Sequence, residues 1–276
     1  MMVQRLAAFS NGRSGGNPAG VLIGDSLPDV AAMQRIAREV GYSETAFAAA
    51  EGESWRVRYF SPESEVPFCG HATIALGAVL AMRHGEGIHA LVLNDARITV
   101  EGRRDGELFA ASLQSPPTRS AQAGRELVDA AMRLFALEAA DLDPRLPAAR
   151  IHAGADHLLV ALADRRRLAH MDYDLAAGRA LMAAAGLVTI ALVQAREPQQ
   201  FDVRNAFASG GVLEDPATGA AAAALAGYLR DLDWPHGGFI RISQGDDMGM
   251  SSRLDAAIPA SPGSSIKVSG TARLMD

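Results

Sequence analysis

Two short segments of the chain place side chains that could move a proton beside stretches of small residues. Residues 66–74 read VPFCGHATI and residues 214–222 read EDPATGAAA. The first carries Cys69 and His71, and the second carries Asp215. Both have the composition of a helix start, where unpaired N–H groups and a partial positive charge favour a bound carboxylate or phosphate. Either segment alone is more simply interpreted as a turn into a buried helix. The pair favours one anion site, provided that the two halves of the chain face each other across a cleft.

The helices that follow these segments are apolar on nearly every side. They read HATIALGAVLAMR (71–83) and ATGAAAAALAGYLR (217–230). A helix of this kind in a globular protein is buried. We therefore predict two similar halves, each with strands wrapped around a central helix. A weak internal repeat supports this, because in each half a strand and a turn with Gly and Thr precede the small-residue helix.

Hydrophobic spacing elsewhere predicts mostly strands. Strands are expected at 55–60, 90–94, 97–101, 108–113, 157–162, 188–194, 201–208, 238–243 and 265–269, and helices at 28–40, 124–136 and 175–185. Many strands with few crossover helices favour an α+β fold. The segment QSPPTRSAQ (114–122) has the composition of a linker. It divides the chain into domains 1–117 and 118–276, with the last strand able to pack on the first domain.

Composition excludes several classes of protein. The chain has 276 residues, 49% hydrophobic and 21% charged, which is typical of a globular protein with a substantial core. A net charge of −6 argues against a nucleic-acid surface. No segment is long and apolar enough for a membrane span or a signal peptide, and a single cysteine excludes an internal disulfide. We therefore expect a cytoplasmic protein with no nucleic-acid or membrane partner.

Five motifs then occur in an order that resembles a known family. They are GNPAG (16–20), YSETAF (42–47), EVPFCGHAT (65–73), LEDPATGAA (213–221) and QGDDMG (244–249). Together they closely resemble the phenazine-biosynthesis PhzF-like family of isomerases over nearly the whole chain. The resemblance implies the diaminopimelate epimerase-like fold, with two similar domains and an active site between them. It also implies a homodimer and a small carboxylate-bearing substrate.

The resemblance assigns Glu44 as the principal acid/base, because it is the glutamate of the SET motif. A carboxylate in the otherwise apolar SETAFAAA segment also suits proton transfer on independent grounds. Asp215 is a second catalytic candidate, and a role in capping the following helix is equally plausible and compatible. His71 could donate to the substrate or carry a proton, and its functional case depends mostly on the family. Substrate contacts are expected from Asn17, Gly70, Thr218, Gly219, Ala220 and Gln244.

Several features argue against cofactors and metals. The histidines show no HExxH or other metal-ligand spacing, and the glycine-rich segment 10–20 lacks the Lys-Ser/Thr of a phosphate loop. We therefore expect neither a metal nor a cofactor. Cys69 occupies the position of one thiolate of the fold-related epimerases, but the second half has no cysteine, so a two-thiol mechanism is impossible. We interpret Cys69 as a packed small hydrophobe.

The chain departs from the family pattern where Ala7, Ala220, Met250 and Ser269 replace an aspartate, a serine, an arginine and a glycine. These changes alter the expected pocket, so the substrate of the best-known member cannot be transferred. The leading hypothesis is a cofactor-independent isomerase that uses Glu44. One alternative is an amino-acid racemase or epimerase with Glu44 and Asp215 as opposed bases. The other is a non-catalytic binding or scaffold protein that retains the fold.

Overall fold

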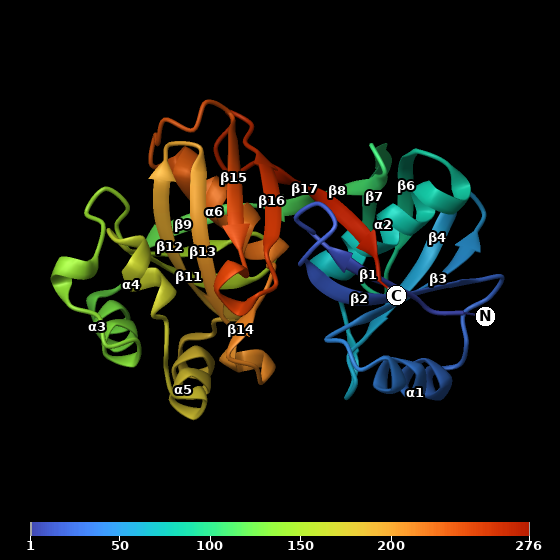
Figure 1. The fold of residues 1–276 in the computed structure, drawn as a ribbon, viewed down its shortest axis with the longest axis horizontal. Helices are drawn as coiled ribbons and strands as arrows, with labels where there is room; N and C mark the ends of the chain where they lie inside the picture. The colour runs from blue at the N-terminus through green and yellow to red at the C-terminus, as the bar shows by residue number, and fades with distance from the viewer. Residues whose placement is uncertain (1, 276) are drawn as a thin grey trace. The chain divides into compact units, whose positions relative to one another are not determined.

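A computed structural model describes residues 2–275 as two compact units (Figure 1). The first unit contains the described residues up to Gln114 together with those from Ser269 onward, and the second contains Ser115–Val268. Elements of the first are β1 (Gln4–Ala8), β2 (Asn17–Gly24), α1 (Val30–Val40), β3 (Thr45–Glu51), β4 (Ser54–Phe60), β5 (Glu65–Val66), α2 (Gly70–His84), β6 (Gly87–Val92) and β7 (Arg97–Asp105). Elements of the second are β9 (Arg119–Gln122), α3 (Arg125–Leu134), β10 (Ala149–His152), β11 (Asp156–Ala161), α4 (Arg165–Ala169), α5 (Leu175–Ala185), β12 (Thr189–Glu197), β13 (Gln200–Ala206), β14 (Glu214–Asp215), α6 (Gly219–Asp231), β15 (Phe239–Gln244) and β16 (Ser252–Ala257). Strands β8 (Leu108–Pro117) and β17 (Ser265–Leu274) have residues in both units and pair with each other.

The two units repeat the same strand pairing. In the first, β1–β2 is antiparallel, β2–β3 parallel, β3–β4 antiparallel, β4–β6 parallel and β6–β7 antiparallel. In the second, β10–β11, β11–β12, β12–β13, β13–β15 and β15–β16 follow the same alternation. The short strands β5 and β14 also occupy equivalent places, each antiparallel to the strand before it and three residues before the N-cap of the next helix. The internal repeat indicated by the sequence is present, and the mixed α+β class is confirmed.

The two small-residue helices are buried, as predicted. Residues 71–81 of α2 and nearly all of α6 from Gly219 to Arg230 lie in the interior of their units. Helix α2 packs against β1, β2, β3, β6 and β7, and α6 packs against β9, β10, β11 and β16. A helix without a polar face has to be enclosed in this way, because exposure of its apolar sides to water would be unfavourable.

Glycines allow α2 to lie directly on β7. A Cβ atom added to Gly102 of β7 would lie 2.3 Å from the carbonyl oxygen of Gly77 in α2. One added to Gly77 would lie 2.5 Å from Cγ2 of Val100. The helix and the strand therefore touch backbone to backbone at this point, which fixes how deeply α2 sits.

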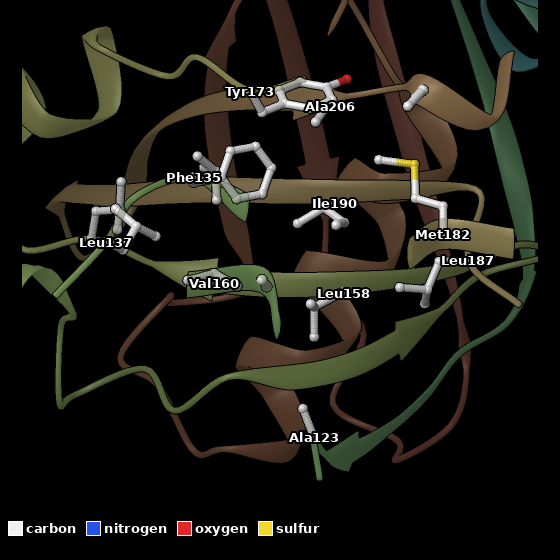
Figure 2. Packing of buried hydrophobic residues seen from close by; sticks show 14 of the residues in the cluster. Ala123, Phe135, Leu137, Leu158, Val160, Tyr173, Met182, Leu187, Ile190 and Ala206 are labelled. Carbon is white, nitrogen blue, oxygen red and sulfur yellow. The ribbon is translucent and has the colours of Figure 1, made fainter. Parts of the chain in front are cut away.

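Other helices pack on further buried clusters. In the second unit, alternate residues of β11 and β12, among them Leu158 and Ile190, form a buried cluster with Phe135, Tyr173 and Met182 (Figure 2). The rings of Phe135 and Tyr173 meet edge to face, with centroids 5.2 Å apart. This cluster contains side chains of α3 and α5 and none of α6. It therefore lies on the opposite side of the strands from α6. In the first unit α1 covers a smaller cluster with β3 and β4.

The segment 114–122 was predicted to be a linker between two domains, and most of it forms strands where a loop was expected. Residues up to Pro117 continue β8, and residues 119–122 form β9, which pairs antiparallel with β10. Polar residues and prolines suggested a loop, but backbone pairing with residues 149–152 overrides that local preference. The chain does pass from one unit to the other in this region, between Gln114 and Ser115, slightly before the predicted boundary at residue 117. Among residues 2–275 the structure has no helix with the length and apolar character that a membrane crossing requires.

Candidate active site

Glu44 stands at the entrance of β3, just after α1 has ended. Helix α1 ends at Gly41, whose φ of 74° is the left-handed conformation that glycine adopts without strain. The chain then enters β3, which runs parallel to β2, and the N–H of Gly20 donates to the carbonyl of Glu44 at 3.1 Å. This fixes the backbone of Glu44, and its side chain is only 18% exposed.

His71 lies in the first turn of α2, and its side chain faces Glu44. Nε2 of His71 is 3.4 Å from Oε2 of Glu44 and 3.4 Å from the hydroxyl of Ser43. The imidazole is 8% exposed, because α2 is buried from this residue onward. The structure thus brings together two of the three predicted catalytic residues, which are separated in sequence by β3, β4 and β5. A largely buried carboxylate beside an imidazole can take up and return a proton.

Cys69 differs from the prediction of a packed small hydrophobe. It is half-buried, and its Sγ lies 3.3 Å from Nδ1 and 3.9 Å from Nε2 of His71. Because both ring nitrogens are within 4 Å, the sulfur sits beside the imidazole ring and not in line with either N–H. Glu44, Cys69 and His71 therefore form one cluster, in which a ligand atom of each lies within 4.8 Å of the others.

The start of α2 is open to an anion. Cys69 is the N-cap and makes no side-chain cap hydrogen bond. The first bond of the helix runs from the N–H of Thr73 to the carbonyl of Cys69, so the N–H groups of Gly70 and His71 precede it. An added Cβ at Gly70 would meet no atom within 4 Å, which shows open space beside this residue. An uncapped helix start with open space beside its first residue is suited to binding a carboxylate.

Two buried hydroxyl groups hold the turn before α2. The hydroxyl of Tyr59 lies 2.7 Å from that of Thr73, which donates to the carbonyl of Cys69 at 2.6 Å. Burial raises the pKa of Tyr59 far above its ordinary value, and the Thr73 hydrogen bond only partly opposes this. The phenol therefore stays protonated. Functional roles for Ser43, Tyr59 and Thr73 were not predicted from the sequence. Ser43 was accessible as the neighbour of Glu44, whereas the role of Tyr59 depends on tertiary contact.

Asp215 belongs to a second cluster, in the second unit. Its carboxylate accepts a hydrogen bond from the hydroxyl of Thr218, and its carbonyl accepts one from Nε2 of Gln244 at 2.7 Å. Arg204 of β13 binds both carboxylate oxygens of the adjacent Glu214 at 3.1 Å, which holds β14 in place. Asp215 is thus positioned at the turn before α6.

The start of α6 is partly occupied by protein groups. Thr218 is its N-cap and makes no side-chain cap hydrogen bond to the helix, while its N–H donates to Oε1 of Gln244 at 3.3 Å. The backbone amide of Thr218 and the side-chain amide of Gln244 therefore have partners within the protein, and substrate contacts from these two residues stay a prediction. Gly219 and Ala220 form the first turn of α6, and ligand contacts from them stay a prediction.

Asn17, the remaining predicted ligand contact, is buried at the start of β2. It pairs with Ala8 of β1, and only 3% of the residue is exposed. Its contact with a ligand stays a prediction, as does the joint action of the Glu44 and Asp215 clusters on one substrate.

Comparisons with known proteins all indicate the same family. A sequence profile of the PhzC-PhzF family, described as phenazine biosynthesis-like protein, matches residues 6–275. An "uncharacterized isomerase" of Mesorhizobium japonicum is 32% identical, with 89% of this chain and 86% of that protein covered. The trans-2,3-dihydro-3-hydroxyanthranilate isomerase of Pseudomonas fluorescens is also 32% identical, with coverage of 90% and 87%.

Solved structures support the same fold. The crystal structure of a PhzF-family phenazine biosynthesis protein from Bacillus anthracis superimposes with a TM-score of 0.86, covering 99% of this chain and 96% of that one. At 22% identity this match bears on the fold alone. The sequence matches extend over both units and both motif segments. The chain therefore belongs to the PhzC-PhzF, phenazine biosynthesis-like family.

Proposed function

We propose that this protein is a cofactor-independent isomerase that moves a proton within a small carboxylate-bearing substrate, with Glu44 as the acid/base. Membership of a family with several relatives named isomerases supports the reaction class. The single observation that carries the mechanism is the pairing of Glu44 with His71 at 3.4 Å, beside the uncapped start of α2.

The N–H groups of Gly70 and His71 bind the substrate carboxylate. Open space at Gly70 admits it, and the partial positive charge of the helix N-terminus stabilises it. Hydrogen bonds from backbone amides hold the substrate carboxylate in its ionised form. The reacting carbon then lies within reach of Glu44, which supplies the carboxylate of the cluster.

Glu44 removes a proton from one carbon of the substrate and returns it to another. One C–H bond breaks, one forms, and the electron pair moves along the intervening double bond, so no oxidant or co-reactant is needed. His71 holds the carboxylate of Glu44 in position through Nε2 and can stabilise charge that develops on the substrate. A single base on one face is sufficient for such a shift.

The substrate of the Pseudomonas fluorescens relative is a reasonable first compound to test. Its name specifies trans-2,3-dihydro-3-hydroxyanthranilate, a small carboxylate. Ala220 offers no hydroxyl at the first turn of α6, so we expect a preference for other small carboxylates over this compound. The panel should therefore include unsaturated amino acids and hydroxy acids.

Deuterium uptake from heavy water tests the proposal directly. The purified protein is incubated with each carboxylate, and incorporation at carbon is followed by NMR and mass spectrometry. Glu44→Gln preserves shape but removes the group that titrates, so we expect exchange to fall by about 10²–10⁴-fold. Glu63→Gln is the matched control, because Glu63 is an exposed glutamate in the loop before β5.

Ligand binding separates a chemical defect from a structural one. The Glu44→Gln variant should bind carboxylates and sulfate as the unmodified protein does, because the anion contacts come from backbone amides of α2. Exchange in the Gln variant at the unmodified rate would refute the role of Glu44. The absence of exchange on every member of the panel, in protein shown to bind carboxylates, would favour a binding protein.

A further inference from the structure

We propose that Glu44, Cys69 and His71 form a binding site for one zinc-type divalent ion, and that occupation of this site blocks proton transfer. Binding of the ion depends only on the cluster, whereas the inhibition rests on the proposed function. Within residues 2–275 this is the one group of three or more His, Cys, Asp or Glu residues whose ligand atoms lie close enough to share an ion.

The distances in the cluster are close to those of a tetrahedral zinc site. Zn–S bonds of about 2.3 Å and Zn–N and Zn–O bonds of about 2.0–2.2 Å place sulfur and nitrogen about 3.6 Å apart, and nitrogen and oxygen about 3.4 Å apart. Nε2 of His71 lies 3.4 Å from Oε2 of Glu44 and 3.9 Å from Sγ of Cys69. Coordination requires the sulfur to move closer and the imidazole to turn so that Nε2 faces the ion. Rotation about the Cβ–Cγ bond of histidine has a broad, shallow preference, so this turn is accessible.

The chemistry of the ligands selects the metal. A thiolate, an imidazole and a carboxylate form a donor set for zinc and for cobalt used as its probe, whereas magnesium and calcium require oxygen ligands. Three protein ligands leave a fourth position for water or a substrate carboxylate. The hydroxyl of Ser43 also lies near the cluster, 3.4 Å from Nε2 of His71.

Electrostatics at the start of α2 permit an ion only because two ligands are anionic. The partial positive charge of a helix N-terminus alone would repel a cation. The thiolate of Cys69 and the carboxylate of Glu44 together carry two negative charges, which balance those of a divalent ion.

An ion in this position coordinates Glu44 and His71, the two side chains that the proposed reaction uses. The lone pair of Glu44 that would accept the proton is committed to the metal, and Nε2 of His71 can no longer support the carboxylate. Zinc should therefore inhibit deuterium exchange, and a chelator should restore it. Because all three ligands bind as unprotonated groups, zinc affinity should fall as pH is lowered.

Metal binding is measured on the full chain without substrate. The protein is treated with a chelator, dialysed, and titrated with zinc by calorimetry and with cobalt by absorption spectroscopy. We expect one ion per chain and a sulfur-to-cobalt charge-transfer band, since Cys69 is the single cysteine. Zinc, but not magnesium, should also slow alkylation of Cys69 in the unmodified protein, which requires no variant.

Variants separate this site from adventitious binding. Cys69→Ser should abolish the charge-transfer band and weaken zinc binding by more than about 100-fold, because loss of an outer partner alone costs about 10–100-fold. His152→Asn is the matched control, since His152 pairs with Asp156 at 3.0 Å and is another histidine–carboxylate pair. This control should bind zinc as the unmodified protein does.

The outcomes are decisive for the site and independent of the reaction. Failure to bind zinc, a cobalt spectrum without the sulfur band, or unchanged affinity in Cys69→Ser with unchanged alkylation would overturn the proposal. Zinc binding without deuterium exchange would leave the metal site standing and count against the isomerase. Deuterium exchange that zinc does not affect, in protein that binds zinc through Cys69, would refute the inhibition.

Discussion

Replacement of Gly102 by alanine tests whether the depth of α2 controls the candidate active site. The new Cβ would lie 2.3 Å from the carbonyl oxygen of Gly77 and 2.9 Å from Cβ of Ala81, both on α2. Separations under 3.0 Å do not occur for real Cβ atoms, so the helix has to move away from β7 by at least 0.7 Å (3.0 − 2.3). A backbone carbonyl cannot rotate aside as a flexible side chain can.

The expected cost follows from this contact. Overpacking a well-packed core costs about 1–3 kcal/mol, and a backbone obstacle places this variant near the upper end. Alanine is the better strand residue by about 0.5–1 kcal/mol, which leaves a net loss of about 2 kcal/mol in the free energy of unfolding. That corresponds to a fall in Tm of about 4–8 °C. Because α2 also carries His71, a shift approaching 1 Å should reduce deuterium exchange by about 10–100-fold.

Gly77→Ala is the informative comparison, because it adds the same methyl group from the helix side of the same contact. Its Cβ meets Cγ2 of Val100 at 2.5 Å and Cβ of Ala111 at 2.9 Å, which are side-chain atoms and not backbone atoms. Alanine also gains about 1 kcal/mol of helix propensity over glycine. Thermal unfolding followed by circular dichroism should therefore rank Gly102→Ala as less stable than Gly77→Ala. A Gly102→Ala protein with unchanged Tm and exchange rate would refute the backbone contact as the determinant of helix depth.

Three further predictions concern other parts of the chain. Asp215→Asn should leave deuterium exchange within about 10-fold of the unmodified rate if one base acts, whereas a loss of about 10²–10⁴-fold would indicate the two-base racemase. His157 is buried against the hydroxyl of Thr189, and desolvation lowers its pKa to about 4. Between pH 6.5 and 4, His157 binds a proton in the unfolded chain, where a histidine pKa is about 6.5, but stays neutral in the folded chain. The free energy of unfolding should therefore drop by about 3 kcal/mol over this range. Urea titrations across this range should show a shallower pH dependence for His157→Gln, and an identical dependence would contradict the assignment. The protein should sediment as a homodimer at micromolar concentration, and a 29.0 kDa species alone would exclude this.

Elements with a strong local pattern were predictable from the sequence. The helix expected at 175–185 coincides with α5, and the one expected at 28–40 is α1, which ends at Gly41. Their apolar spacing and terminal glycines act within one or two turns, so the information is local. The strands that were missed, among them β2 and β10, are stabilised by partners elsewhere in the chain.

The segment 114–122 illustrates the limit most clearly. Its prolines and polar residues have the composition of a loop, yet β8 and β9 occupy most of it. Residues 119–122 pair with residues 149–152, which follow in the sequence only after a helix and a loop. Strand stability of this kind depends on the neighbouring strand, which the local sequence does not specify.

For the candidate site, the sequence identified residues but not their relations. Glu44, His71 and Asp215 stand in recognisable motifs, and the burial of α2 and α6 follows from their composition, because a helix without a polar face has to be enclosed. The prediction that the chain has no metal site was based on the spacing of possible ligands along the sequence. Spacing could relate Cys69 to His71, but Glu44 reaches them only because β3, β4 and β5 turn the chain back. The sequence by itself therefore determined the family, the two buried helices and the acid/base candidates. The tertiary structure alone decided that a thiol, an imidazole and a carboxylate meet at one helix start, since their proximity depends on strand pairing over long sequence separations.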